Sequence, residues 1–78
     1  MDKHIIGTNA GVLWQLLSTD SQRKWNFAEI KEITNFSDVE LASAIGWLAR
    51  ENKIQLELPK HSGEERPGLI YLMLNFYF

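Results

Sequence analysis

The sequence predicts one small α+β domain in which three helices are followed by a two-stranded β-hairpin. At 78 residues the chain has room for a single domain. Two patterns, Asn26-x-x-Glu29 and Ser37-x-x-Glu40, each match a helix start in which the N-cap side chain and the carboxylate three residues later bond each other's backbone N–H. Further along, an alternating apolar stretch and a nearly continuous apolar stretch each have the pattern of a β-strand.

The first helix is expected over Ala10 to Leu17. One stripe of this helix is apolar and should face the core. Its members are Ala10, Leu13, Trp14 and Leu17, with Leu16 beside them. Thr8 or Asn9 is the expected N-cap, and the sequence leaves the choice between them open.

The second helix is expected over about Phe27 to Thr34 and should bury Phe27, Ile30 and Ile33. Asn35 is the expected end of this helix, because Asn tolerates the left-handed conformation that often closes a helix.

The third helix is expected from Asp38 to about Glu51. Its core stripe follows helical spacing and consists of Leu41, Ala44, Ile45 and Leu48. A short helix, a tight turn and a second helix together form a helix-turn-helix.

The remaining chain predicts the hairpin. Residues Ile54 to Leu58 alternate as a strand with one buried face, and Pro59 stops them. A polar loop follows, and Leu69 to Phe78 form the second strand. Lys24-Trp25 adds a residue or two of extended chain. Three helices and a hairpin with a long polar tip describe a winged helix-turn-helix, whose wing is the tip.

Two segments also resemble a known family. The motif Ile6-Gly7-x-x-Ala10-Gly11-Val12-x-Trp14 and the run from Gly46 to Ile54 are similar to a small bacterial family of winged helix-turn-helix domains of unassigned function. The resemblance covers essentially the whole chain and implies the fold, without supplying any catalytic or DNA-contacting residue.

Charge weakens the case for DNA. The net charge is −2, and over Asn26 to Glu51 two basic and five acidic residues give 2 − 5 = −3 on the motif that should approach phosphate. On the outer face of the third helix, only Ser43 and Arg50 suit contacts with base edges. The first interpretation is a transcription regulator that binds DNA through these two residues. The alternative is a protein-interaction or dimerisation module on the same scaffold.

Exposed apolar residues favour that alternative. Trp47 lies across from the core stripe of the third helix, where it either packs within the chain or contacts a partner. The last strand is apolar on both faces, so a second chain or the protein's own helices should cover one of them. A homodimer through this strand would use Tyr71, Met73 and Tyr77, with Trp47 joining from the helix.

Other chemistry is not indicated. His4 and His61 are the only histidines and there is no cysteine, so we expect no metal site, cofactor or catalytic group, and no enzyme. The longest apolar run is too short to cross a bilayer. Without cysteines or an apolar secretory segment, the sequence predicts a cytoplasmic protein.

Overall fold

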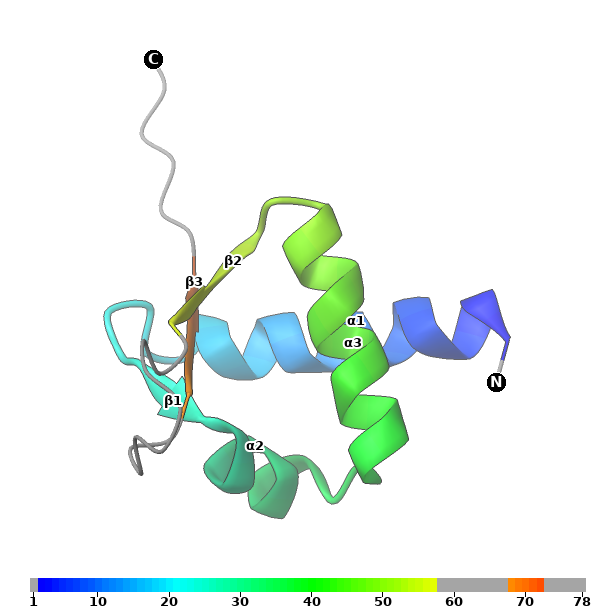
Figure 1. The fold of residues 1–78 in the computed structure, drawn as a ribbon, viewed down its shortest axis with the longest axis horizontal. Helices are drawn as coiled ribbons and strands as arrows, with labels where there is room; N and C mark the ends of the chain where they lie inside the picture. Colours follow the sequence, from blue (N-terminus) through cyan, green and yellow to red (C-terminus); the bar gives the residue numbers. More distant parts are fainter. Residues whose placement is uncertain (1, 58–67, 73–78) are drawn as a thin grey trace, which may run out of the picture.

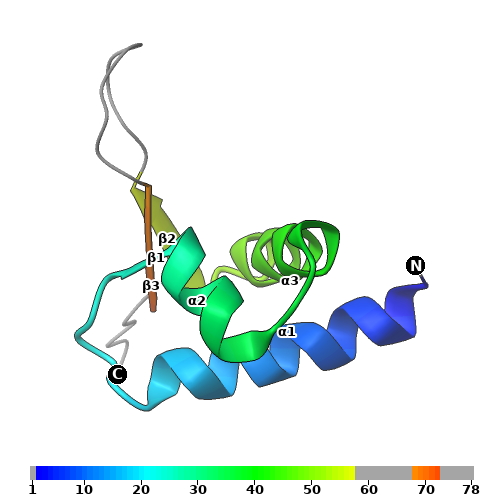
Figure 2. The same cartoon turned by 90° about the horizontal axis from the view of Figure 1, so that it is seen from below.

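The computed structural model describes residues 2–57 and 68–72. Three helices and a small antiparallel sheet form the described part, which confirms the predicted α+β class (Figure 1). In chain order the elements are α1 (Lys3–Ser18), β1 (Trp25–Asn26), α2 (Phe27–Thr34), α3 (Asp38–Arg50), β2 (Ile54–Glu57) and β3 (Leu69–Leu72). Helix α3 crosses α1, and the sheet lies beside the two helices (Figures 1 and 2).

Both predicted capping boxes are present. At the start of α2, Oδ1 of Asn26 accepts the Glu29 N–H at 2.8 Å, and the Glu29 carboxylate accepts the Asn26 N–H at 3.0 Å. At the start of α3, Oγ of Ser37 accepts the Glu40 N–H at 3.1 Å, and the Glu40 carboxylate accepts the Ser37 N–H at 2.8 Å. Each box satisfies two backbone donors that a helix start otherwise leaves unpaired.

The ends of these helices use asparagine. Asn35 closes α2 with φ 58°, as predicted. Asn52, with φ 59°, follows α3 in the same conformation. There the Lys53 N–H donates to Leu48 O at 2.9 Å and the Asn52 N–H to Ala49 O at 3.1 Å. This pair of bonds is a Schellman motif, which turns the chain sharply from α3 toward β2.

Helix α1 begins about two turns earlier than predicted. Its N-cap is Asp2, whose side chain accepts the Ile5 N–H at 3.0 Å, so neither Thr8 nor Asn9 caps it. Gly7 lies within this earlier part of the helix, yet a glycine costs only about 1 kcal/mol in a helix interior. The cap and the long apolar stripe outweigh that cost.

Within the described residues the sheet has three strands, where the sequence predicts two. Their order is β1-β3-β2, and both pairings are antiparallel. Trp25 pairs with Ile70 on one side of β3, and Ile54 pairs with Leu72 on the other. Strand β3 is therefore central in the described sheet. The predicted strand residues beyond Glu57 and Leu72, and most of the predicted wing, lie outside the described residues.

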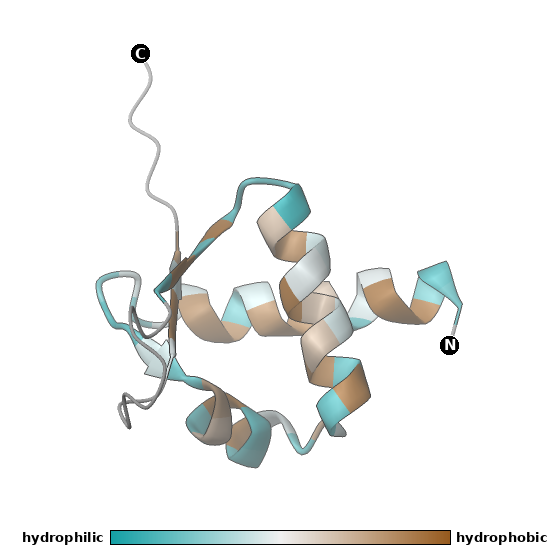
Figure 3. Cartoon of the chain, viewed as in Figure 1, coloured by the Kyte–Doolittle hydropathy of each residue, from teal (hydrophilic) through white to brown (hydrophobic). Residues whose placement is uncertain are grey.

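The core forms where α1, α3 and the sheet meet (Figure 3). All four predicted α3 residues belong to it, and its full membership in the described chain is Ala10, Leu13, Leu17, Trp25, Ile30, Leu41, Ala44, Ile45, Leu48, Ile54 and Ile70.

Three apolar residues predicted to be buried are exposed instead. Trp14 keeps 43%, Ile33 56% and Leu56 43% of their surface accessible. Three residues advance a helix by about 300°, so Ile33 lies to one side of the fully buried Ile30. No described element buries that side of the two-turn α2, since Ile33 stays 56% exposed. Trp14 and Leu56 lie at the rims of two hollows described below.

Candidate interaction surfaces

The outer face of α3 is more apolar than a DNA-reading helix should be. Ser43 is half-buried, and Arg50, two helical turns further along the same face, is exposed. Beside them Val39 is 65% and Trp47 37% exposed. Glu40 has its carboxylate engaged by the Ser37 backbone N–H, which holds the pKa of Glu40 below its usual value. The face therefore offers base edges few free polar groups.

Ion pairs take up half of the described basic side chains. The three pairs are Arg23 with Glu29, Lys24 with Glu57 at 2.9 Å, and Lys31 with Asp38 at 2.7 Å. Each pair is exposed to solvent and adds little stability. Their importance lies in the charge that they neutralise around α2 and the sheet. Among residues 2–57 and 68–72, the basic side chains outside these pairs are Lys3, Arg50 and Lys53.

Tyr71 is partly covered from within its own chain. It lies on the outer face of the sheet opposite Gln55, and Nζ of Lys24 is 4.9 Å from the centre of its ring. The hydrogen bond to Glu57 raises the pKa of Lys24, so this cation stays charged over the ring. Met73 and Tyr77, the other predicted interface residues of this strand, lie outside the described residues.

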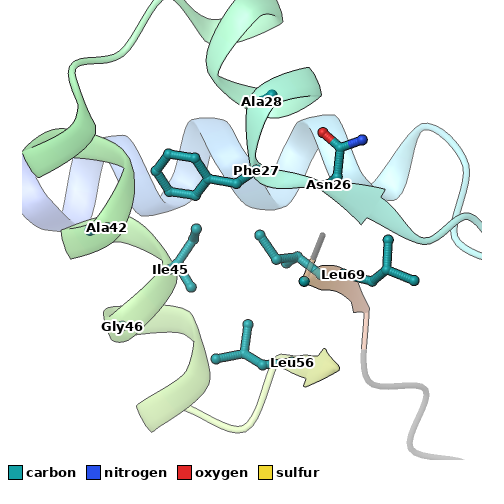
Figure 4. A pocket seen from close by; sticks show the side chains of 10 residues that line it. Asn26, Phe27, Ala28, Ala42, Ile45, Gly46, Leu56 and Leu69 are labelled. Carbon is teal, nitrogen blue, oxygen red and sulfur yellow. The ribbon is translucent and has the colours of Figure 1, made fainter. Parts of the chain in front are cut away.

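An open apolar pocket of about 750 Å³ lies between α2, α3 and the sheet, and we call it the α3–sheet pocket (Figure 4). Its lining residues are Asn26, Phe27, Ala28, Ala42, Ile45, Gly46, Leu56, Gly68, Leu69 and Ile70. None of them is charged. Asn26 has the one polar side chain among them, and its Oδ1 already caps α2.

Small residues on the helices keep this pocket open. Ala42 and Gly46 form its α3 wall one turn apart, and Ala28 forms part of its α2 wall. A Cβ added at Gly46 would meet nothing within 4 Å. The half-exposed Leu56 stands at the rim. Such a space can take a bulky apolar group but offers almost no hydrogen bonds.

A second, smaller hollow of about 300 Å³ lies between α1 and α3, and we call it the Trp14–Trp47 hollow. Its lining residues are Gly7, Ala10, Gly11, Trp14, Trp47, Leu48 and Lys53. The outward position predicted for Trp47 is correct, since its ring borders this hollow and stays partly exposed. Ser43 and Arg50 border neither hollow.

Sequence reasoning missed most of these surface residues. Trp14 was assigned to the core because it shares the apolar stripe of α1. Ala42, Gly46 and Leu56 come from separate elements, and no local motif links them. The one signal in the sequence for these surfaces was the presence of glycines in helical segments. Gly7, Gly11 and Gly46 all have open space where a Cβ would lie.

No group of three or more His, Asp or Glu side chains that could hold a metal ion occurs in the described residues. In the same part of the chain, no helix combines the length and apolar character needed to cross a membrane.

The comparisons with known proteins address the family. No curated protein and no solved structure matches the chain. The model of one family, described as "Winged helix-turn-helix domain (DUF2582)", matches residues 1–74. The helix order, the turn between α2 and α3 and the antiparallel sheet agree with that description. The chain therefore belongs to this family of winged helix-turn-helix domains.

Proposed function

We propose that this domain is a protein-interaction module that receives an apolar side chain of a partner in the α3–sheet pocket. The observation that carries the proposal is the pocket itself, a space of about 750 Å³ between α3 and the sheet, in which none of the described lining residues is charged. A protein interface commonly centres on a large side chain that fills such a pocket. The alternative function, regulation of transcription through duplex DNA, has less support.

Charge is the reason that duplex DNA is disfavoured. Duplex binding gains most of its affinity from Lys and Arg contacts with phosphate. In the helix-turn-helix, Lys31 is paired with Asp38, which leaves Arg50 as the one unpaired cation of the described motif. The carboxylates of Glu29 and Glu40 are kept ionised by their capping bonds, because both have lowered pKa values.

The lining of the pocket defines the group that it would accept. A charged side chain would lose its hydration there and find no charged partner among the described lining residues, which is costly. A Leu, Ile, Met or Phe side chain would instead exchange water for contacts with Phe27, Ile45 and Leu69. We therefore expect the partner segment to carry one large apolar residue at the centre of the contact.

A peptide selection tests this function. A random peptide library displayed on phage is selected on the full-length protein, and the enriched peptides are synthesised and titrated by calorimetry. We expect them to share one large apolar residue. Ala42→Glu places a charge on the pocket wall and should weaken binding by about tenfold or more, because the charge is desolvated by the bound segment.

Ser43→Glu is the matched control. It adds the same charge at the next residue of α3, which does not line the pocket. We expect the selected peptides to bind Ser43→Glu nearly as well as the parent protein. Equal affinity for all three proteins, or equal loss in both variants, would contradict binding in the α3–sheet pocket.

A further inference from the structure

The unpaired cations of the described chain gather around the Trp14–Trp47 hollow. Lys53 lines the hollow directly. Arg50 lies one turn beyond Trp47 on α3, and Lys3 lies one turn before Gly7 on the same face of α1. The cations that are held in ion pairs lie instead on α2 and beside the sheet. Lys53 therefore lines the hollow, and Arg50 and Lys3 each lie one helical turn from a lining residue, so the cations that remain free to bind an anion lie in or near it.

The walls of the hollow suit a flat ring. Two partly exposed indoles border it, with Trp14 at 43% and Trp47 at 37% exposure. Gly7 and Gly11 also line it, and a Cβ added at either glycine would meet nothing within 4 Å. Glycine exposes the helix backbone, so a planar group can lie close against it. The volume of about 300 Å³ has room for one such group and not for a folded element.

We propose that the Trp14–Trp47 hollow binds single-stranded nucleic acid, with one base stacked on the indoles and the neighbouring phosphates contacting Lys53, Arg50 and Lys3. Aromatic platforms flanked by cations are the arrangement by which proteins bind single strands without sequence preference. An acidic peptide would satisfy the cations equally well. The two indoles and the two glycines that line the space favour a nucleobase over an aliphatic side chain.

This inference does not rest on the proposed protein partner. α3 contributes Ala42, Ile45 and Gly46 to the α3–sheet pocket, and Trp47 and Leu48 to the hollow. The two surfaces therefore use different faces of α3 and can be occupied together. A single strand also needs far fewer phosphate contacts than a duplex, since stacking supplies part of its affinity.

Glu51 is an acidic residue that opposes such binding. It lies one turn beyond Trp47 at the C-terminal end of α3, where the helix dipole also disfavours an anion. Removing its charge should strengthen binding to a single strand. A gain of affinity is informative, because loss of structure cannot produce it.

Fluorescence anisotropy with a labelled oligothymidylate of twelve or so nucleotides tests the proposal. We expect saturable binding at low salt. With three phosphates neutralised, log K should fall against log salt with a slope of about −2. A duplex of the same length should bind at least about tenfold more weakly, because its bases cannot stack on the indoles. The thymidylate should also quench the tryptophan fluorescence.

Variants separate the contribution of base stacking from that of the phosphate contacts. Trp47→Leu should weaken binding by about fivefold or more through lost stacking. Lys53→Gln should make the salt slope shallower by about 0.7. Lys24→Gln is the matched control, because Lys24 is held by Glu57 on the outer face of the sheet, and it should leave both quantities unchanged. Glu51→Gln should raise the affinity.

Several results would overturn the proposal. One is displacement of the oligothymidylate by oligoglutamate of equal length at similar concentration, which would mean a site for acidic peptides or any polyanion. Others are no binding at low salt, or equal losses in Lys24→Gln and Lys53→Gln. If circular dichroism shows that Trp47→Leu does not fold, the affinity of Glu51→Gln for the oligothymidylate becomes the deciding measurement. An unchanged affinity in Glu51→Gln contradicts the proposal.

Discussion

Lys31 and Asp38 are joined across the turn of the helix-turn-helix, with Nζ 2.7 Å from the carboxylate oxygen Oδ1. Lys31 is the one basic residue of α2, and this pair neutralises it. Asp38 is the first residue of α3, where a carboxylate also complements the helix dipole. The end of the motif that would enter a DNA groove thus presents a neutral pair and the capping carboxylate of Glu40, which favours a partner other than duplex DNA.

The cap of α3 should be measurable in stability. Ser37→Ala leaves the Glu40 N–H without its acceptor, and we expect a loss of about 1 kcal/mol in the free energy of unfolding. Ser43→Ala is the control, since Ser43 lies inside the same helix and Ala favours helix there. Urea titration followed by circular dichroism should show a lower midpoint for Ser37→Ala alone. An unchanged midpoint would mean that Ser37 is not the cap.

Two isoleucines of α2 should respond very differently to truncation. Ile30 is fully buried, and Ile30→Ala should cost about 2–5 kcal/mol. Ile33 is 56% exposed, and Ile33→Ala should change stability by about 0.5 kcal/mol or less. The measurement is the free energy of unfolding in urea at neutral pH. Similar losses in both variants would contradict the orientation of α2 in the structure.

Stability should fall in acid because of the capping glutamates. The pKa of Glu29 is lowered by the Asn26 backbone N–H and by Arg23, and that of Glu40 by the Ser37 backbone N–H and hydroxyl. A depressed folded-state pKa contributes stability that is complete above the ordinary value of 4.5 and is lost as pH falls through the folded-state value.

The check is a series of urea midpoints from neutral pH down to pH values below the ordinary glutamate pKa. Glu40→Gln should flatten the acid decline, because Gln does not titrate. Glu32→Gln, outside both capping boxes, should leave the decline as steep as in the parent protein. An equally steep decline in Glu40→Gln would show that this box does not set the pH dependence.

The sequence was most predictive where backbone groups were satisfied locally. The starts of α2 and α3 agree to the residue, because Asn26 and Ser37 bind groups only three residues away. The observed start of α1 is earlier than the predicted one, because Gly7 and Gly11 weaken the helical pattern that follows the cap at Asp2. β1 was anticipated only as a residue or two of extended chain, and its pairing with β3 depends on a partner far along the sequence.

The candidate surfaces were much harder to predict. Periodicity identifies an apolar stripe but does not tell which edge of it a neighbouring element covers. Trp14 and Ile33 both belong to predicted apolar stripes, yet each lies on the edge of its helix that no neighbouring described element covers. The α3–sheet pocket depends on small residues such as Gly46 lying opposite strand residues such as Leu69, and only tertiary structure brings them together.

A homodimer through the C-terminal strand stays a prediction, with a changed residue dependence. Lys24 occupies one face of Tyr71, and β3 already has a strand on each side. We therefore expect any dimer to depend on Met73 and Tyr77. Sedimentation velocity at high micromolar concentration should give a dimer for the parent and for Tyr71→Ser, and a monomer when Met73 and Tyr77 are both replaced by Ser. A monomeric parent protein would refute the dimer.

Titration of a labelled random-sequence duplex by fluorescence anisotropy at physiological salt tests the central claim most directly. With Lys31 paired and −3 on the helix-turn-helix segment, few counterions can be released from the duplex. We predict no saturable binding of the parent protein in the micromolar range. Asp38→Ala frees Lys31, and we expect that this variant also fails to reach sub-micromolar affinity for the duplex. Sub-micromolar affinity of the parent protein with a steep salt dependence would contradict the account and restore duplex DNA as the partner.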